Sequence, residues 1–525
     1  MQIYNTETGR KEHFAPPELR VKFYVCGLTP KNEPHLGHAR LFVVNDMVRS
    51  YLEYRGYRVT YVQNFTDIDD KIIAAGLREG ISPSDAARRY TESYFDDMDR
   101  LGVRRADIFT YVTEFIPQII EFISGLIANG HAYELEGDVY FSVPSFASYG
   151  RLSGRDQEAM LAGARIEPDE RKHDPRDFAL WKSAKPGEPW WESPWGRGRP
   201  GWHIECSTMI KETLGEQIDI HGGGADLIFP HHENEIAQTE SLTGKTPFVR
   251  YWLHTGMLSL PSEEDSTSDM GTPEKMAHSS GEPENLEKMA HSGTFITIRS
   301  VLQDGTVSAP ALRLYLLGQQ YRANLVFSSE QLRASVTRWK RWVQTRSTLQ
   351  RLIAWSQAAE GDVPAEEGSG PAERQLRKEI AAAKEEFLEA MDDDFNTSRA
   401  LGAIDELAHR ANEYATSLGG ETPSPTVHAA LGHALAALEE LTSVLGIQLS
   451  SGEVAMNTLT PEQVLEVEAY IQQRKEARAA KNWGEADRIR KVLEDEYQVT
   501  IKDTPQGTTW ELRELVEGAG VSGSA

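Results

Sequence analysis

The stretch FYVCGLTPKNEPHLGHAR, residues 23–40, decides the fold. An apolar run over 23–25 ends in Cys26 and Gly27, and a proline-containing turn follows. A helical pattern then begins at about Gly37, with apolar residues every three or four positions. Strand, loop and helix in this order predict the first crossover of a parallel α/β sheet, in which ligands bind beyond the carboxyl end of the strand.

Two histidines, His35 and His38, stand at the start of this predicted helix. A helix N-terminus presents free backbone N–H groups and suits phosphate. Histidines beside it can add donors to a phosphoryl group whose charge changes during a reaction. Two histidines at a turn are also typical of an ordinary surface, so their role depends on the rest of the chain.

Length, composition and net charge limit the classes of protein to which the chain can belong. Its 525 residues predict two to four domains. No run of eighteen apolar residues occurs and residues 1–7 lack a signal pattern, so we expect a cytoplasmic protein that is not in a membrane. The net charge of -25 argues against nucleic-acid binding over the whole surface, although a local basic face would suffice. The only two cysteines cannot build a disulfide framework, which raises the question of a metal.

A second parallel strand is expected over 57–63, and NFTDIDDK (64–71) follows it. Thr66 and Asp67 are then placed to orient a substrate amine or ribose, the alternative being that this segment caps a helix beginning near Asp69. Residues 82–129 alternate helical patterns with turns. From 130 to 200, short alternating runs and a Trp- and Pro-rich segment predict an insertion of antiparallel strands between two halves of the sheet.

The second half of the sheet carries a candidate metal site. A short strand over 219–221 leads into Gly222 and Gly223, which let the backbone approach a ligand closely. Pro230 is predicted to start a helix with His231 and Glu235 on one face. We expect the two cysteines at strand ends, where they would complete a set of four ligands that zinc accepts. The four are Cys26, Cys206, His231 and Glu235.

Alternatives remain for this cluster. His232 or Glu233 could replace either helical ligand, since both are adjacent to the chosen pair. The order of residues over 231–235 fits neither of the histidine–glutamate motifs of metallohydrolases. A polar helix start beside two buried free cysteines is the bland explanation.

Together these motifs resemble the cysteinyl-tRNA synthetase family, in class I of the aminoacyl-tRNA synthetases, over nearly the whole chain. The similarity is carried by YVCG (24–27), NFTDIDDKII (64–73), GWHIEC (201–206) and the segment 221–235. HLGH (35–38) corresponds to the class I HIGH signature and implies ATP binding by His35, Gly37 and His38. The resemblance places zinc on the four ligands named above, with the substrate thiolate bound to the ion. Serine would be rejected because a hydroxyl is a poor ligand for zinc.

The expected KMSKS loop of the family departs from its pattern. Two near-repeats occur, EKMAHS at 274–279 and again at 287–292, and only the second leads into GTFITIR (293–299). We therefore place the working loop at 288–292 and interpret 261–287 as a flexible insertion. Lys288 is kept, but His291 replaces the second lysine, and a neutral imidazole donates one hydrogen bond without supplying charge.

The remainder is predicted to be helical. Apolar periodicity recurs from 309 to about 445, and a linker rich in Gly, Glu and Pro covers 361–370. Basic residues surround Trp483 within 460–496, which could grip an unstacked anticodon base or could form a salt-bridged surface helix pair. The ending, TIKDTPQGTTW (500–510), is similar to that of the family.

The fold class that we predict is α/β: a class I Rossmann-type parallel sheet with an inserted connective subdomain, followed by an α-helical bundle and a small C-terminal module. The expected boundaries are 1–129 and 201–260 for the two catalytic halves, 130–200 for the insertion, 261–308 for the inserted segment and loop, 309–450 for the tRNA-binding bundle, and 460–525 for the anticodon-binding module.

The resemblance implies a monomer that uses ATP with Mg²⁺, L-cysteine and tRNA(Cys). The implied roles are phosphate contact for His35, His38, Lys288 and His291, amino-acid contact for Thr66, Asp67 and Trp202, and ATP contact for Gly222, Gly223 and Asp226. Two rival functions remain, namely a ligase joining activated cysteine to a small amine and a non-catalytic tRNA-binding paralogue.

Overall fold

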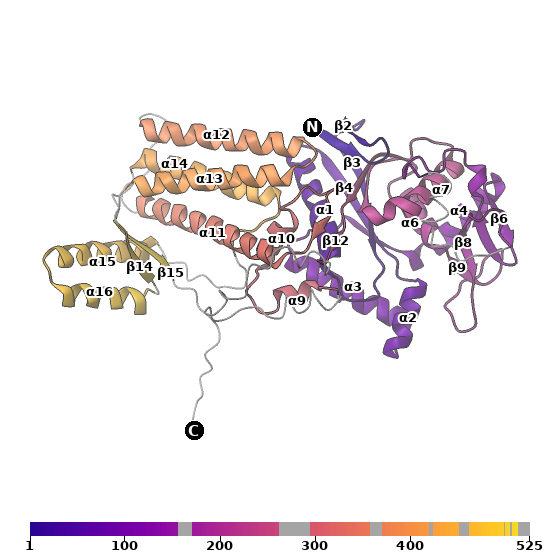
Figure 1. The fold of residues 1–525 in the computed structure, drawn as a ribbon, viewed down its shortest axis with the longest axis horizontal. Coiled ribbons are helices and arrows are strands. Elements are labelled where there is room, and N and C mark those ends of the chain that lie inside the picture. Colours follow the sequence, from indigo (N-terminus) through magenta and orange to yellow (C-terminus); the bar gives the residue numbers. More distant parts are fainter. Residues whose placement is uncertain are drawn as a thin grey trace, which may run out of the picture. The chain divides into compact units, whose positions relative to one another are not determined.

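The computed structural model describes residues 1–155, 171–261, 295–357, 370–418, 424–450, 461–497, 499–504 and 507–512. The chain forms two compact units. Unit 1 comprises Met1–Arg333, Ala390–Ser398 and Val444–Gly446, and unit 2 comprises Ala334–Glu389, Arg399–Ser443 and Ile447–Ala525. Figure 1 labels the elements of both units. No helix within these residues is long and apolar enough to cross a bilayer.

A parallel sheet is the centre of unit 1. Within the described residues its strand order is β11-β10-β3-β4-β5, with β3 at Arg20–Leu28, β4 at Arg58–Phe65, β5 at Ile108–Tyr111, β10 at Ile218–Gly224 and β11 at Val249–Thr255. Chain order runs outward from β3 in one direction and then restarts with β10 on its other side. Ligands of such sheets bind where the order reverses, beyond the carboxyl ends of the two central strands. The predicted fold class is confirmed, although the short strand β5 was not predicted within 82–129.

Helix α1 (Leu36–Tyr54) follows β3 and is largely buried, as the apolar periodicity predicts. Its N-cap is His35, whose side chain forms a capping box with His38. The buried guanidinium of Arg40 donates hydrogen bonds to the carbonyl oxygens of Gly256 and Ala323, at 2.9 and 2.6 Å. These bonds fix the start of α1 against Gly256, which follows β11, and against Ala323.

Further helices of unit 1 are α2 (Asp70–Glu79), α3 (Pro83–Arg100), α4 (Ile116–Ala128), α6 (Trp202–Thr213) and α7 (Glu233–Thr243). Of these, α6 and α7 carry residues of the candidate site. Side chains of α4, α6 and α7 share one core with β3 and β4, including Ile119, Met209 and Ile236. The core therefore packs α6 and α7 beside the carboxyl end of β3.

The region predicted as an insertion contains antiparallel strands. They are β6 (Ala132–Leu135), β7 (Asp138–Phe141), β8 (Phe178–Ser183) and β9 (Gly198–Pro200), paired in this order. The prediction of antiparallel strands is confirmed for the described part of this region.

Unit 1 extends beyond the predicted start of the helical bundle at 309. Helix α10 (Ala309–Leu316) belongs to it, because the buried Arg313 donates to Asp46 of α1 at 2.5 Å and to the carbonyl oxygen of Leu445 at 2.8 Å. The short elements β12 (Leu258–Ser259), α9 (Ile298–Leu302) and β13 (Leu325–Val326) also lie in this unit. The boundary between unit 1 and unit 2 in this part of the chain therefore falls at Arg333, within the helix α11.

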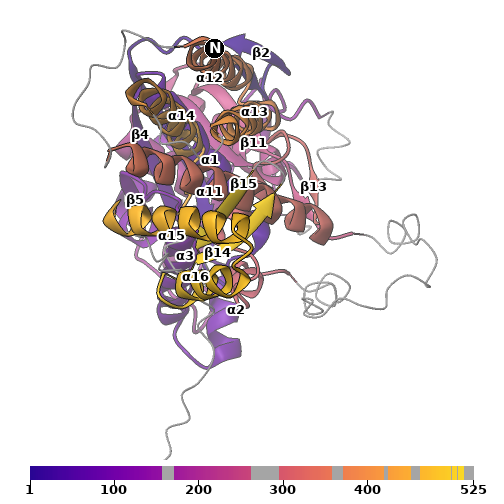
Figure 2. The same cartoon turned by 90° about the vertical axis from the view of Figure 1, so that its left-hand side faces the viewer.

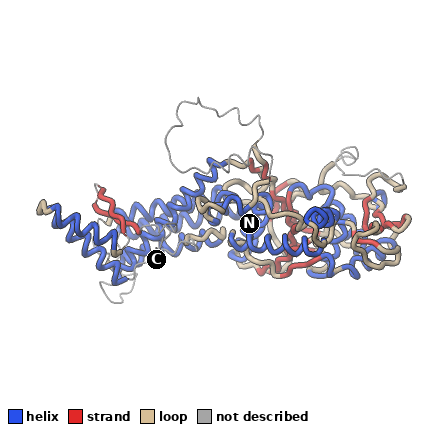
Figure 3. The backbone as a smooth tube through the Cα atoms, turned by 90° about the horizontal axis from the view of Figure 1, so that it is seen from below, coloured by secondary structure: helices blue, strands red, loops and turns tan. Residues whose placement is uncertain are grey.

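Unit 2 is mainly helical, as the tube in Figure 3 shows. Its bundle is drawn from α11 (Ser329–Gln357), α12 (Pro371–Asp392), α13 (Thr397–Ser417) and α14 (Pro425–Val444). The helices α15 (Pro461–Ala479) and α16 (Trp483–Asp495) lie side by side and pack on the hairpin of β14 (Val499–Thr504) and β15 (Gly507–Leu512) (Figures 1 and 2). Glu468 accepts from Arg351 and from the indole of Trp510, both at 2.9 Å, which joins this module to α11.

Candidate metal centre and active site

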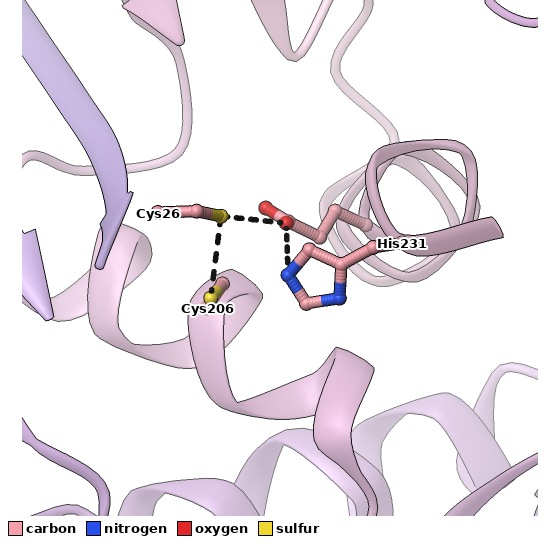
Figure 4. A group of neighbouring side chains, drawn as sticks. Cys26, Cys206 and His231 are labelled. Carbon is pink, nitrogen blue, oxygen red and sulfur yellow. Dashed lines mark hydrogen bonds and ion pairs between the residues drawn. The ribbon is translucent and has the colours of Figure 1, made fainter. Parts of the chain in front are cut away.

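Four side chains from distant parts of the sequence meet at the carboxyl end of β3, and we call them the Cys/His/Glu cluster. Cys26 comes from β3, Cys206 from α6, His231 from the turn before α7, and Glu235 from α7. Figure 4 shows the two sulfur atoms and the imidazole turned toward a common point. Each of the four is at most 4 % exposed, and all four ligand atoms lie within 4.8 Å of one another.

The distances in the cluster suit a tetrahedral ion. The Sγ atoms of Cys26 and Cys206 are 3.8 Å apart, and Cys26 Sγ lies 3.6 Å from Glu235 Oε1. An ion holding thiolates at about 2.3 Å and a carboxylate at about 2.1 Å requires separations of about 3.8 and about 3.6 Å. His231 Nε2 is 3.0 Å from Glu235 Oε1, a hydrogen-bond distance that an ion would lengthen slightly. The donor set therefore fits zinc.

Local structure differs from the prediction at two of these ligands. Cys206 lies within helix α6 and not after a strand, because its neighbours Ile204, Met209 and Ile210 form the buried face of that helix. Pro230 does not start the α-helix: residues 228–232 form one wider turn, and α7 begins at Glu233. His231 still reaches Glu235 because the turn continues into the helix.

The electrostatics of the cluster favour a bound cation. Burial works against ionisation of Glu235, but the imidazoles of His221 and His231 hold the pKa of its carboxyl at about 2. A hydrogen bond from the Cys26 thiol lowers the pKa of Cys206, whereas burial raises that of Cys26. Although burial lowers it, the pKa of His231 is raised to about 10 by Glu235 and Cys206. The proton on His231 thus occupies the place that a bound metal ion would take.

An outer ring of histidines supports the cluster, and the sequence analysis gave these residues no role. His221 Nε2 lies 2.9 Å from Glu235 Oε2, and His203 Nδ1 lies 2.9 Å from His231 Nδ1. His254 lies 2.8 Å from His232 through ring nitrogens. Such partners orient metal ligands and leave the opposite atom free for the ion. His203 and His221 lie in segments that carry the family resemblance, GWHIEC and 221–235, whereas nothing in the sequence pointed to His254.

The structure distinguishes between the two alternative ligands, His232 and Glu233. Glu233 accepts hydrogen bonds from the backbone N–H groups of Gly150 and Ser153, both at 2.9 Å, so its carboxylate is already occupied. His232 Nε2 lies 3.4 Å from Cys26 Sγ, and Cys26, His221, His232 and Glu235 form a second group with ligand atoms within 4.8 Å. Glu233 is thereby removed as a ligand, while His232 stays beside the site.

The predicted amino-acid contacts lie in two environments. Trp202 stacks on His231 with ring centroids 4.3 Å apart and remains 37 % exposed, so it forms a wall beside the cluster. Thr66 is buried and donates to Glu205 at 3.1 Å. Asp67 accepts from the backbone and the hydroxyl of Thr113 at 3.0 and 2.5 Å. Trp202 thus contacts the cluster through His231, whereas the hydrogen bonds of Thr66 and Asp67 go to Glu205 and Thr113.

The histidines at the start of α1 have a defined protonation. His35 Nδ1 accepts from the backbone N–H of Gly37 at 3.1 Å, and His38 Nδ1 accepts from that of His35 at 3.3 Å. An accepting ring nitrogen carries no proton, so each neutral ring is protonated on Nε2. Burial lowers the pKa of His35 to about 4, with help from Lys31, and that of His38 to about 3, with help from His35. Both are therefore neutral donors at pH 7.

The glycines of β10 make room for protein side chains. A Cβ on Gly222 would meet Asn45 Oδ1 at 2.5 Å, and one on Gly223 would meet the His232 ring at 2.5 Å. The predicted close approach at these two positions thus includes Asn45 and His232. Asp226 is exposed in the turn after β10. Lys288 and His291 lie outside the described residues.

Comparisons with known proteins agree with this arrangement. The family described as "tRNA synthetases class I (C) catalytic domain" matches residues 15–272, and the "DALR domain" matches 386–450. A methionyl-tRNA synthetase from Mycobacterium tuberculosis, solved in complex with methionyl-adenylate, superposes with a TM-score of 0.58 at 15 % identity, covering 85 % of this chain and 93 % of that one. The sheet, its insertion and these matches define a class I aminoacyl-tRNA synthetase.

Two curated relatives show to which family within this class the chain belongs. The cysteine–tRNA ligase of Heliobacterium modesticaldum is 46 % identical over 97 % of this chain and 99 % of its own length. That of Dehalococcoides mccartyi is 44 % identical over 98 % of this chain and 100 % of its own length. The chain therefore belongs to the cysteine–tRNA ligase family, and the sequence-based prediction of family, fold and enzyme class is confirmed.

Proposed function

We propose that the chain attaches L-cysteine to tRNA(Cys) in two steps and selects cysteine through zinc held by the Cys/His/Glu cluster. The cysteine carboxylate attacks the α-phosphorus of ATP and pyrophosphate leaves. The terminal ribose hydroxyl of the tRNA then attacks the acyl carbon and AMP leaves. Bound zinc supplies a centre that prefers a thiolate to a hydroxyl. The observation that carries the proposal is the convergence of two cysteines 180 residues apart, with sulfur atoms 3.8 Å apart.

The chain's own residues position the reactants and stabilise charge. Trp202, stacked on His231, closes one side of the amino-acid site and excludes water from the cluster. His35 and His38 donate from Nε2 to phosphate oxygens on which negative charge increases, and Gly37 between them lets the chain approach ATP. Because both rings are neutral, they add donors without a fixed charge. No side-chain nucleophile is needed.

The remaining contacts are proposed from the sequence. Thr66 and Asp67, just after β4, are proposed to contact the amino acid. Gly222 and Gly223, at the carboxyl end of β10, and Asp226, in the turn after it, are proposed to contact the adenosine. Mg²⁺ accompanies ATP. The helical unit and its α15–α16 module bind tRNA, which the match to the DALR domain supports over a small-molecule ligase. A cytoplasmic monomer is part of this proposal.

His291 bears on how fast the first step runs. Lys288 and His291 are proposed to contact pyrophosphate, and a neutral imidazole lacks the charge of the second lysine in the family motif. Losing one such group costs on the order of 10²–10³ in rate in comparable sites. His291→Lys is therefore expected to increase kcat of cysteine-dependent ATP–pyrophosphate exchange, with Ser292→Ala as the neighbouring control. An unchanged kcat would remove His291 from the proposed pyrophosphate contact.

The experiment that tests the function compares two adjacent glutamates. Glu235→Gln removes a cluster carboxylate, whereas Glu233→Gln changes a buried carboxylate that is bonded to backbone N–H groups. Zinc content and cysteine-dependent exchange should both fall in Glu235→Gln and stay near parent levels in Glu233→Gln. Equal zinc content in the two variants would contradict the proposed site. Charging of tRNA(Cys) by the parent chain separates the synthetase from both rival functions.

A further inference from the structure

Phe295 is an aromatic side chain beside the start of α1. It is 71 % exposed, although its neighbours Ile296 and Ile298 are buried. A single exposed aromatic residue is common on protein surfaces and carries no conclusion by itself. Its ring contact does, because the partner is a proposed ATP-contacting residue.

Three rings form one continuous stack at this place. The rings of His38 and His35 lie 3.6 Å apart at 22° to one another, and those of His35 and Phe295 lie 5.0 Å apart at 14°. His35 is therefore the ring common to both contacts, stacked with His38 and with Phe295. Stacked rings attract each other beyond the area that they bury.

The backbone holds Phe295 in this position. Leu36 donates its N–H to the carbonyl oxygen of Ile296 at 3.0 Å, and Ile298 donates to that of Pro34 at 3.2 Å. These two bonds enclose the antiparallel bridge between His35 and Thr297. The aromatic ring is thus tied by main-chain bonds to the same turn whose histidine it covers.

We propose that Phe295 is a positioning residue for cysteine activation, which holds the plane of the His35 imidazole while Nε2–H donates to phosphate. The cap bond from Gly37 fixes only Nδ1, so the ring can still swing about that atom unless neighbouring rings restrain it. Small displacements of a charge-stabilising donor reduce rate more than binding. This inference rests on the proposed role of His35.

The test uses the full chain loaded with zinc and compares side chains at position 295. Phe295→Leu keeps an apolar group but removes the stack, and it should lower kcat of cysteine-dependent ATP–pyrophosphate exchange about two- to tenfold. KM for cysteine and zinc content should not change. Phe295→Tyr keeps the ring and should keep kcat. Leu77→Ala, at a leucine of α2 that is 80 % exposed, is the control for loss of an exposed apolar side chain.

A double variant separates this inference from the function beneath it. His35→Ala should lower kcat, and adding Phe295→Leu to it should lower kcat no further, because the partner of the stack is already absent. If His35→Ala keeps the parent kcat, the proposed role of His35 fails. If His35→Ala is slow but Phe295→Leu matches the parent, or the two losses multiply, positioning by Phe295 is overturned.

Discussion

The Cys/His/Glu cluster and the start of α1 both present histidines to a ligand, but they prepare them in opposite ways. His231 lies among anionic groups, and its pKa is raised to about 10. His35 and His38 lie among backbone groups and each other, and their pKa values are lowered to about 4 and about 3. The first environment favours a cation, and the second provides neutral hydrogen-bond donors for an anion. The surroundings, and not the residue type, decide what each histidine can bind.

The largest effect is expected from removing a ligand of the Cys/His/Glu cluster, which tests that side of the comparison. Cys206→Ala removes one of two thiolates, and zinc affinity should fall by more than the roughly 10–100-fold that loss of an outer-shell partner costs. Cysteine activation should fall with it to background. Metal analysis after dialysis and ATP–pyrophosphate exchange measure the two effects, with Ser207→Ala on the same helix as the control. A variant that keeps stoichiometric zinc would contradict the ligand set.

The second largest effect is expected from removing a histidine at the start of α1, the other region of the comparison. His38→Ala removes a neutral donor at the start of α1, and kcat of the exchange reaction should fall on the order of 10²–10³-fold. Zinc content should remain at the parent level, because His38 belongs to the second environment only. Parallel measurement of kcat and bound zinc checks both. Loss of zinc in this variant would mean that the two regions are not independent.

A smaller effect sharpens the comparison within the cluster. His221 lies 2.9 Å from the Glu235 oxygen that is not shared with His231, so His221→Ala should loosen the ligand without removing it. Competition with a chelator should show zinc binding weakened roughly 10–100-fold. An affinity loss as large as that of Cys206→Ala would make His221 a ligand instead, as the second group of ligand atoms allows.

The smallest effect is on stability and depends on pH. The folded chain keeps His38 neutral down to a pKa of about 3, whereas the unfolded chain protonates it near 6.5. The free energy of unfolding therefore has its full value above pH 6.5 and falls as the pH is lowered from 6.5 toward 3. His38→Gln should make this fall shallower and leave the dependence above pH 6.5 unchanged. Urea unfolding across this range measures it; an unchanged slope would contradict the lowered pKa.

The two regions also differ in how far the sequence could predict them. Cys26 and Cys206 are the only cysteines, and the spacing of His231 and Glu235 suits one helical face, so composition and local periodicity pointed to these four residues but left His232 and Glu233 open as alternatives. His203 and His254 reach the cluster only through the packing of α6 and the register of β11, which local patterns do not contain. Sequence spacing likewise missed that Cys206 lies on a helix and that β5 is a strand.

At the start of α1 the motif could be recognised but not its geometry. The capping bonds that set the tautomers of His35 and His38 depend on side-chain orientation, and the covering ring of Phe295 comes from a segment far along the chain. Local patterns also did not show that side chains from α1 and from the turn before α7 closely approach Gly222 and Gly223. Long-range packing decided these points.

X-ray absorption at the zinc edge, with and without cysteine, tests the central claim most directly. The account predicts two sulfur ligands with one nitrogen and one oxygen in the free protein, and a third sulfur once cysteine is added, with no change on adding serine. A zinc centre without two sulfur ligands, or one whose sulfur count is the same with and without cysteine, would contradict it.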